Sequence, residues 1–467
     1  MLSVITPTEA ARLERASAVG VDVLMDRAGR AVVQAAVAMG ATYGKRVVVL
    51  AGPGNNGGDG YVAARLLRER GVGVKVRALS EPKTDAAVLA RERAAATGVL
   101  IEDLIAPEPC DVVIDALFGG GFRPGIDSTV EAWIHSGQRV LAVDIPSGVD
   151  PLTGKVIDGA FRAERTVTFG AHKVGHLLNQ GPDYSGSVEV ADIGLPAPDP
   201  AMYLTEKSDV PIPRRTRTTH KWSAGSVLVV GGAVGMTGAA VMAGRAALHF
   251  GAGAVGLAVP EAAAQVAAAT APELLHHHLD DIPERYQVLV IGPGLGREHD
   301  DLATKLIATW SGPVVVDADA LSLVTESGPK SVPVSPSSGG RAGEAGRGVV
   351  LTPHAGEFER MGGGEPSPES ATALALELGA IVLLKGNPTV VAGSGTPWII
   401  NSGGPELATI GTGDVLAGML GALLAQGLEA AVAARTAAFW HGTAGARLGR
   451  GTTVTALGLI EEIGSIR

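Results

Sequence analysis

Cysteine is almost missing from this chain, and its absence excludes one way of holding a fold together. Cys110 is the only cysteine among 467 residues, so no disulfide can form within the chain. This usage is typical of proteins in a reducing compartment, and we expect Cys110 to be a half-buried filler. Residues 1–19 contain scattered charges and no apolar core segment. We therefore expect no secretory signal and a cytoplasmic location.

Aromatic residues and positive charge are also scarce. Aromatic side chains make up 4% of the sequence, and the formal net charge is −10. An acidic chain of this kind is not expected to bind nucleic acid or an anionic membrane as its main partner. What the sequence has instead is 65 glycines and a hydrophobic fraction of 46%, which favour an α/β chain with many tight strand-to-helix turns.

One long uncharged run has to be weighed as a membrane span. Residues 224–244 carry no charge, and a run of this length could cross a bilayer as a helix. The run contains six glycines and is followed by Arg245. We therefore expect it to form a strand, a glycine turn and a buried helix.

The chain is too long for one ordinary domain, and prolines mark a break in it. They recur between Gly194 and Arg217 and interrupt any periodic pattern there. We expect two domains, residues 1–210 and 211–467. A second irregular stretch, residues 333–348, is expected to be a loop within the second domain.

Apolar, β-branched runs alternate with helical patterns on both sides of this break. Before it, the expected strands are residues 46–51, 74–79, 111–115, 140–144 and 166–169, with helices such as 61–70 and 86–97. Beyond it, they are residues 227–230, 288–291, 314–317, 349–352 and 381–384. Strands that alternate with helices predict parallel sheets with right-handed crossovers. The fold class is therefore α/β, with two parallel-sheet domains.

A glycine-rich stretch, residues 52–60, follows the first of these strands and precedes a helix. The spacing Gly52-x-Gly54-x-x-Gly57 fits the dinucleotide fingerprint, in which backbone N–H groups approach a pyrophosphate. We expect residues 55–59 to form a loop and the helix to begin at Tyr61. Two amides and a carboxylate in this loop are more than a phosphate turn needs, and they indicate chemistry or a bound cation.

Polar side chains follow other strands of the first domain as well. Asp115, Asp144 and Ser147 come directly after apolar runs, and ligands of parallel sheets bind beyond the carboxyl ends of the strands. These oxygens suit a hard cation, and a carboxylate near an anion suits acid–base work. The alternative is that each aspartate only caps the turn after it. For His172 and Lys173, a place in this crevice and a surface turn remain equally open.

The second domain has a comparable feature at Gly411-Thr412-Gly413-Asp414. These residues open an amphipathic helix, 415–426, whose free N–H groups would form an anion hole. Asp414 would be the base that deprotonates a hydroxyl attacking phosphate. A plain N-cap turn is the alternative. The sequence has no P-loop motif.

Three other features are given structural interpretations. Gly251-x-Gly253-x-x-Gly256 also fits the dinucleotide spacing, but a helical run precedes it and not a strand. By its spacing alone, this motif is therefore not expected to bind a dinucleotide. Residues 276–278 are three consecutive histidines without the spacing of a metal site, so we expect a solvated surface. His441 is expected to be a core histidine.

These motifs, in this order, resemble those of the bifunctional NAD(P)H-hydrate repair enzymes. In that family an NAD(P)HX epimerase domain is fused to an ADP-dependent NAD(P)HX dehydratase domain. The resemblance covers nearly the whole chain, from residue 24 to the C-terminal helices, and is most specific at residues 54–60, 144–148, 352–357 and 411–418. It implies a Rossmann-like parallel-sheet sandwich followed by a ribokinase-like domain.

The resemblance also assigns roles to individual positions. It implies that the hydrated dinucleotide of the first domain is held by Asn55, Asn56, Gly57, Gly58, Asp59, Gly119, Gly120, Gly121, Phe122, Arg123, Pro124 and Gly125. It makes Asp144 the acid–base residue and Asn56, Asp115 and Ser147 the ligands of potassium. In the second domain it implies that Ala254, Gly296, His354 and Asp414 contact the hydrate. The adenine nucleotide would be held by Lys385, Gly386, Asn387, Pro388, Thr389 and Gly413.

The same resemblance implies a reaction. ADP would phosphorylate the hydroxyl of the hydrate with Mg²⁺ and Asp414 assisting, and phosphate would then leave to restore NADH or NADPH. Asp144 would interconvert the two epimers by loss of the hydroxyl or by ring opening. The expected partners are NADHX, NADPHX, ADP and further copies of this chain. The preference for ADP over ATP rests on the family alone.

Departures and rival interpretations accompany the resemblance. His172 replaces an expected proline, Trp222 an expected glycine, and Thr412 the commoner serine; Trp222 would alter the nucleotide pocket. One rival is an NAD-dependent dehydrogenase built on the glycine turn, although Glu81 is only a loose match for the ribose-binding acid. The other is a ribokinase-like small-molecule kinase with a non-catalytic first domain.

Overall fold

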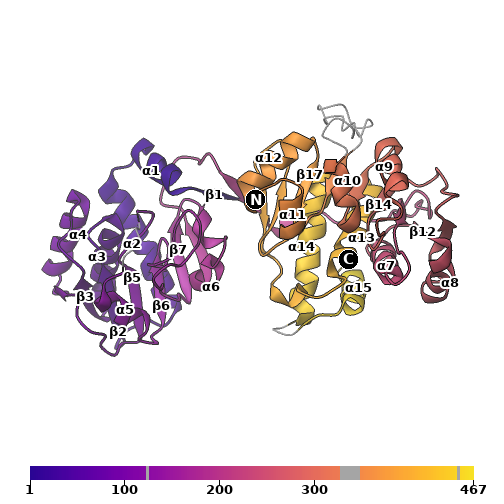
Figure 1. Cartoon of the computed structure of the whole chain (residues 1–467). Coiled ribbons are helices and arrows are strands. Elements are labelled where there is room, and N and C mark those ends of the chain that lie inside the picture. The colour runs from indigo at the N-terminus through magenta and orange to yellow at the C-terminus, as the bar shows by residue number, and fades with distance from the viewer. Residues whose placement is uncertain (122–125, 327–347, 450–452, 467) are drawn as a thin grey trace. The chain divides into compact units, whose positions relative to one another are not determined.

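The computed structural model describes all residues except 122–125, 327–347, 450–452 and 467. The described chain divides into two compact units (Figure 1). We call Leu2–Ala201 the N-unit and Met202–Arg467, which also takes in Met1, the C-unit. Each is described by itself.

The N-unit contains a seven-stranded parallel sheet with the order β4-β3-β2-β5-β6-β7-β9. Its strands are β2 (Arg46–Ala51), β3 (Gly73–Ala78), β4 (Leu100–Asp103), β5 (Val112–Ala116), β6 (Val140–Val143), β7 (Arg165–Phe169) and β9 (Ser187–Ala191). Outside this sheet, β1 (Leu2–Ile5) pairs in parallel with β8 (His172–Lys173). The helices are α1 (Pro7–Ala16), α2 (Val21–Ala38), α3 (Asn55–Glu69), α4 (Asp85–Ala96), α5 (Ser128–Ile134), the short η1 (Val174–His176) and α6 (Gly181–Ser185).

Alternation along β2 explains how the sheet is covered. Val47 and Val49 belong to one core cluster, together with apolar residues of α2, α3 and α4. Val48 and Leu50 belong to another, which includes Trp133 of α5. Successive side chains of a strand point to opposite faces, so α2–α4 cover one face and α5 the other.

The order of strands creates a switch point between β2 and β5. The chain moves from β2 outward to β3 and β4, and then returns to β5 on the other side of β2. At such a point the following loops leave toward opposite faces and open a crevice at the carboxyl ends of the strands. The glycine-rich stretch follows β2, and Asp115 lies in β5.

The C-unit contains a mixed sheet with the order β13-β12-β11-β14-β15-β16-β17-β18-β19-β10. The strands are β10 (Met202–Leu204), β11 (Ser226–Val230), β12 (Ala254–Val259), β13 (Leu275–His278), β14 (Val288–Ile291), β15 (Val314–Val316), β16 (Val349–Leu351), β17 (Ile381–Leu384), β18 (Thr389–Ala392) and β19 (Trp398–Ile400). Pairing is parallel from β13 to β17, antiparallel for β17–β18 and β18–β19, and parallel for β19–β10.

Helices of the C-unit pack on this sheet around one large core cluster. The α-helices are α7 (Thr237–His249), α8 (Glu261–Thr270), α9 (Asp300–Thr309), α10 (Leu321–Glu326), α11 (Ala355–Arg360), α12 (Pro368–Leu378), α13 (Thr412–Ala425), α14 (Ala430–Gly449) and α15 (Ala456–Ser465). Short helices are η2 (Lys207–Asp209), η3 (Ala318–Ala320) and η4 (Pro405–Leu407). Val227 and Val229 share the cluster with residues of α7, α13, α14 and α15, so these helices cover the same face.

The α/β fold class is confirmed, and several of the expected elements are found. β2, β14 and β17 begin and end where the apolar runs do. The uncharged run 224–244 forms β11 and most of α7, and no helix among the described residues is long and apolar enough to cross a membrane. Part of the proline-rich stretch is β10, which pairs with β19. Most of the expected loop at 333–348 lies outside the described residues.

Candidate active sites

The glycine-rich stretch is a helix start, and the expected loop at residues 55–59 is wrong. α3 begins at Asn55, with Gly54 as its N-cap. A Cβ on Gly57 would lie 1.9 Å from the carbonyl oxygen of Gly52, and one on Gly58 would lie 2.4 Å from Cε of Met25. Glycine is required here by close packing of the helix, because neither residue has a positive φ. The helix N-terminus therefore reaches directly into the crevice, where it can face an anion.

Side-chain and backbone groups from three separate segments of the chain converge at this crevice. A Cβ on Gly119 would lie 3.2 Å from Oδ2 of Asp144 and 3.3 Å from Oδ1 of Asn56. The N–H of Gly120 donates to Oδ2 of Asp144 at 3.2 Å. The structure thus brings Asn56, Gly119, Gly120 and Asp144 together. Phe122, Arg123, Pro124 and Gly125 lie outside the described residues.

Asp144 is held as an ionised carboxylate. Its Oδ1 is 3.0 Å from Nζ of Lys173, which is almost fully buried, and accepts a hydrogen bond from the Thr168 hydroxyl at 3.0 Å. Burial by itself raises the pKa of Asp144, but the charge and hydrogen bond of Lys173 outweigh it and hold that pKa below its usual range. Lys173 therefore faces the crevice, and the surface-turn alternative for it is wrong.

Asp115 and Ser147 form a second polar pair in the N-unit, next to Phe118. The Ser147 hydroxyl donates to Oδ1 of Asp115 at 2.7 Å, and the Ser147 N–H donates to Oδ2 at 2.7 Å. The N–H of Phe118 donates to Oγ of Ser147 at 3.0 Å. Burial raises the pKa of Asp115 to about 6, although the bonds from Ser147 oppose it. Nδ2 of Asn56 is buried without a hydrogen-bond partner in the described part of the chain.

Asp59 has the opposite electrostatic character to Asp144. It lies in the second turn of α3 and is 8% exposed. Burial, with smaller contributions from the negative charges of Asp144 and Glu14, raises its pKa well above the usual range. This shift favours the protonated form of the Asp59 carboxyl group, which can donate a hydrogen bond.

In the C-unit a buried lysine pairs with an aspartate at a strand end. Nζ of Lys385, after β17, donates to Oδ1 of Asp317, after β15, at 2.9 Å. The Thr352 hydroxyl donates to the same oxygen at 2.7 Å, and Oε2 of Glu357 is 3.8 Å from Nζ. Burial lowers the pKa of Lys385, but Asp317, Glu357 and Asp414 raise it above its usual value overall. Lys385 is therefore a fixed cation.

The start of α13 lies beside this lysine. Gly411 is the N-cap with φ 91°, and a Cβ on Gly413 would lie 3.6 Å from Nζ of Lys385. The hydroxyl of Thr412 donates to the carbonyls of Leu407 and Thr409, at 2.9 and 2.8 Å. Thr412 thus anchors the turn by a hydroxyl, which serine would also supply. The first N–H groups of α13 and a buried cation together form an anion site.

Asp414 stands at this anion site without a fixed partner. No hydrogen bond to its carboxylate is present among the described residues. Burial raises its pKa to about 7, and the charges of Asp317 and Asp319 add to the rise while Lys385 opposes it. A carboxylate with this pKa is suited to accept a proton near neutral pH.

His441 stabilises the turn at the start of α13 through the carbonyl group of Thr412. Its Nε2 is 2.8 Å from the carbonyl oxygen of Thr412, and burial lowers its pKa to about 4. The histidine is therefore neutral and donates to that carbonyl. This position agrees with the expected core histidine.

The remaining predicted residues of the C-unit divide between two ends of the sheet. His354 caps α11 and forms a parallel bridge with Lys385. The N–H of Gly296 donates to Oδ2 of Asp319 at 2.9 Å, and the Thr389 hydroxyl donates to the carbonyl of Gly386 at 3.0 Å. These residues follow the carboxyl ends of strands, near Asp414. Ala254 is the first residue of β12 and lies at the opposite, amino end.

Trp222 also lies at that amino end. Its ring packs against Tyr286, with the centroids 6.0 Å apart, shortly before β14 begins. The guanidinium carbon of Arg285 lies 4.9 Å above the Trp222 ring. Nothing in these contacts brings Trp222 to Lys385 or Asp414, so the expected effect on the nucleotide pocket stays a prediction.

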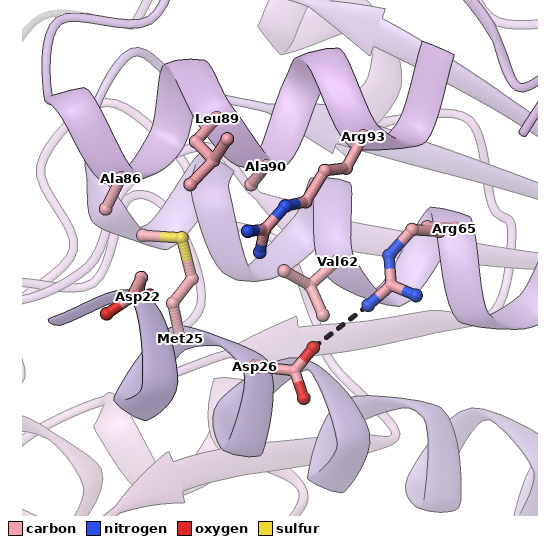
Figure 2. A pocket seen from close by; sticks show the side chains of 9 residues that line it. All are labelled: Asp22, Met25, Asp26, Val62, Arg65, Ala86, Leu89, Ala90 and Arg93. Atoms are coloured by element: carbon pink, nitrogen blue, oxygen red, sulfur yellow. Dashed lines mark hydrogen bonds and ion pairs between the residues drawn. The ribbon is translucent and has the colours of Figure 1, made fainter. Parts of the chain in front are cut away.

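A surface pocket between α2, α3 and α4 lies apart from these groups. Figure 2 shows its lining, with Arg65 paired to Asp26 at 2.9 Å. None of the predicted site residues lines it. The predicted site residues therefore lie outside this pocket.

Comparison with known proteins identifies both halves of the chain. Residues 227–464 match the family model described as NAD(P)H-hydrate dehydratase, and residues 21–175 match that described as YjeF-related protein N-terminus. The bifunctional NAD(P)H-hydrate repair enzyme of Moorella thermoacetica is 36% identical over 474 residues, which cover 91% of this chain and 87% of that protein. The chain belongs to the family of bifunctional NAD(P)H-hydrate repair enzymes.

Two further relatives agree with this membership of the repair-enzyme family. The repair enzyme of Mycobacterium leprae is 38% identical over 433 residues, covering 88% of this chain and 85% of that protein. The crystal structure of a ribokinase-like superfamily protein from Enterococcus faecalis V583 covers 57% of this chain and 95% of its own, with a TM-score of 0.51 and 23% identity. That structure shows the fold alone. The resemblance inferred from the motifs is confirmed.

Sequence reasoning on this repair-enzyme chain missed Thr168 and the pairing of Asp317 with Lys385. Thr168 lies inside β7, where no pattern distinguishes it from other strand residues. Asp317 ends an apolar run and Lys385 ends another, but β16 lies between their strands and no local spacing links the two residues. Asp59 was expected as a ligand of the dinucleotide, and no pattern in the sequence indicated that burial raises its pKa.

Proposed function

We propose that this chain restores hydrated NADH and NADPH, with the N-unit interconverting the two epimers and the C-unit removing the hydroxyl group. Family membership supports both activities. The observation that carries the proposal is that each unit presents its own half-buried aspartate with a shifted pKa, Asp144 or Asp414, at the carboxyl ends of its strands. A ribokinase-like kinase with a non-catalytic first domain is not favoured, because both halves of the chain match the repair-enzyme family.

For the C-unit, we propose phosphoryl transfer followed by elimination. Asp414 accepts the proton of the substrate hydroxyl, whose oxygen then bonds to the β-phosphorus of ADP as the bond to the AMP oxygen breaks. The N–H groups at the start of α13 and the ammonium group of Lys385 stabilise the negative charge on the transferring group. Phosphate then leaves with its C–O electron pair, and a proton is lost from the neighbouring ring carbon. The products are NAD(P)H, AMP and phosphate.

Mg²⁺ would enter this site with the nucleotide. The described residues contain no group of three or more histidine, cysteine or acidic side chains placed to hold a metal ion, which suits a magnesium ion bound mainly by phosphates. Glu357, Asp319 and Asp414 supply carboxylates at the same end of the sheet. The ion would neutralise charge on the phosphates. Selection of ADP over ATP is part of the proposal and rests on the family.

For the N-unit, we propose that the N-terminus of α3 and residues 119–125 hold the hydrated dinucleotide. Asp144, held ionised by Lys173, acts on the hydroxyl-bearing carbon, either by loss and return of the hydroxyl or by ring opening. Potassium would be held by Asn56, Asp115 and Ser147. One carboxylate and two neutral oxygens, from α3, β5 and the segment after β6, suit a monovalent cation.

Location and assembly complete the proposal. The single cysteine supports a cytoplasmic protein, and family resemblance supports a homo-oligomer. The partners are NADHX, NADPHX and ADP, with no nucleic acid or membrane among them.

The test uses mixed epimers of hydrated NADPH with Mg²⁺, K⁺ and either ADP or ATP, and follows the near-ultraviolet absorbance of the reduced nicotinamide. We expect full recovery by the wild-type chain, recovery of only one epimer's share by Asp144→Ala, and none by Asp414→Ala. Failure of the wild-type chain with either nucleotide would overturn the repair function. Full, fast recovery by Asp144→Ala would remove the epimerase from the N-unit.

A further inference from the structure

The backbone at Asp144 is in an unusual conformation that needs support. Asp144 has φ 66°, and the N–H of Ile145 donates to the carbonyl of Val143 at 2.9 Å. This hydrogen bond across one residue, together with the positive φ, makes Asp144 the centre of a tight γ-turn directly after β6. Such turns are strained for a residue other than glycine and persist only where surrounding contacts fix them.

One of those contacts comes from a buried histidine that the proposed mechanism does not use. Nε2 of His176 lies 2.8 Å from the main-chain carbonyl oxygen of Asp144. The N–H of Lys173 donates to Nδ1 of the same ring at 3.1 Å. Because Nδ1 accepts this bond, the ring proton is on Nε2, and Nε2 donates to Asp144. His176 is 2% exposed, so the ring has no solvent partner to compete.

His176 and Lys173 together form a closed arrangement around Asp144. Lys173 holds the carboxylate through its Nζ and holds the His176 ring through its backbone N–H. His176 in turn holds the main chain of Asp144. The side chain and backbone of Asp144 are therefore fixed from the same short segment, β8 and η1. A shift in one contact must change the direction of the carboxylate relative to Gly119 and Gly120.

We propose that His176 is a positioning residue of the epimerase site, acting as a permanently neutral donor that locks the turn at Asp144. It does not contact the substrate; it acts through the Asp144 carbonyl. The charges that face it are those of Lys173, Asp144 and His172, and burial together with Lys173 lowers the pKa of His176 to about 3. The ring therefore keeps one tautomer throughout the physiological range. This inference rests on the proposed role of Asp144.

The test compares two replacements of His176 in the full-length chain. His176→Leu keeps the volume and loses both hydrogen bonds, whereas His176→Gln retains an N–H donor at a similar reach. We expect His176→Leu to lower kcat of the epimerase about 10- to 100-fold, with KM and the dehydratase rate of the same chain unchanged. His176→Gln should regain most of that loss. The matched control is His172→Leu, another buried histidine of the same segment, for which we expect wild-type epimerase rates.

Three outcomes would overturn the proposal. They are wild-type epimerase rates in His176→Leu, an equal loss in His176→Leu and His176→Gln, or an equal loss in the His172→Leu control. A second measurement does not depend on activity: ¹⁵N chemical shifts of the histidine rings should show the Nε2–H tautomer of His176 unchanged between about pH 5 and 8. A titrating ring or the other tautomer would also overturn it. If wild type lacks epimerase activity, the proposed function fails while the tautomer result still stands.

Discussion

The two units place the same pair of residue types, a largely buried lysine and an aspartate that we propose to be catalytic, at the carboxyl ends of parallel strands, but they connect them differently. In the N-unit, Lys173 contacts Asp144 itself at 3.0 Å, and the pKa of Asp144 is lowered. In the C-unit, Lys385 contacts Asp317 at 2.9 Å, and the pKa of Asp414 rises to about 7. Burial acts in the same direction in both sites. The pKa of the aspartate is lowered where the lysine contacts it directly, and it is raised where the lysine contacts another aspartate instead.

This difference matches the chemistry proposed for each site. A base that removes a hydroxyl proton should have a pKa near the working pH, and Asp414 meets that condition because no cation neutralises it directly. Asp144 remains charged, so it can stabilise positive charge at the reacting carbon or accept a proton only from a strong acid. The pKa of Asp59, another carboxyl group of the N-unit, is raised by burial, which favours its protonated form. Environments that separate the pKa values of two carboxyl groups commonly mark an acid and its partner base.

The largest expected effect comes from removing the lysine that the N-unit uses directly. Lys173→Met leaves the buried Asp144 carboxylate without its cation, which typically costs about 3–5 kcal/mol. We expect chemical denaturation, followed by a probe in the N-unit, to show a loss of this size, together with loss of epimerase activity. The dehydratase of the same chain should keep its rate.

A matched replacement in the other unit sharpens the contrast. Lys385→Met leaves Asp317 unpaired, so a comparable loss of stability is expected in the C-unit. Its effect on Asp414 is indirect, since Lys385 lowers that pKa only by its charge, and the remaining dehydratase activity should need a higher pH. An unaltered dehydratase pH profile in Lys385→Met would contradict the comparison.

The parts of this arrangement that sequence could predict are those set by local pattern. Apolar runs located β2, β14 and β17 to the residue, because buried parallel strands are continuous in hydrophobicity. Asp115, Asp144 and Asp414 were found because each ends a strand or opens a helix. Family motifs added the substrate and nucleotide residues, which remain predictions.

The parts that could not be predicted depend on contacts between distant segments. The dinucleotide spacing led us to expect a glycine turn at residues 55–59, whereas these residues are helical and Gly57 and Gly58 pack closely against Gly52 and Met25. The direction of Lys173 and the pairing of Lys385 with Asp317 follow from strand order, which sequence spacing does not reveal. The pKa values follow from those pairings.

The glycines of the two anion sites differ in what they require, and a second prediction uses this difference. A Cβ on Gly52 would lie 1.8 Å from the carbonyl oxygen of Leu117, whereas one on Gly413 would lie 3.6 Å from Nζ of Lys385, an ordinary contact. Gly52→Ala should therefore destabilise the chain by about 1–3 kcal/mol, and Gly413→Ala should leave stability unchanged and weaken ADP binding. Gly54→Ala, with no atom near the added Cβ, is the stability control. Thermal unfolding and ADP titration distinguish the three variants.

The smallest effect, and the most direct test of the electrostatic contrast, is the pH dependence of the two activities in the wild-type chain. Because Asp414 must be deprotonated to act as a base and its pKa is about 7, kcat/KM of the dehydratase should fall below that pH, approaching about tenfold per pH unit. The lowered pKa of Asp144 keeps its carboxylate ionised there, so Asp144 should add no acidic limb to the epimerase profile near neutral pH. Assays on pure epimers, run across the pH range on one preparation, measure both. A shared acidic limb would show that the two lysine arrangements do not separate the two carboxylates.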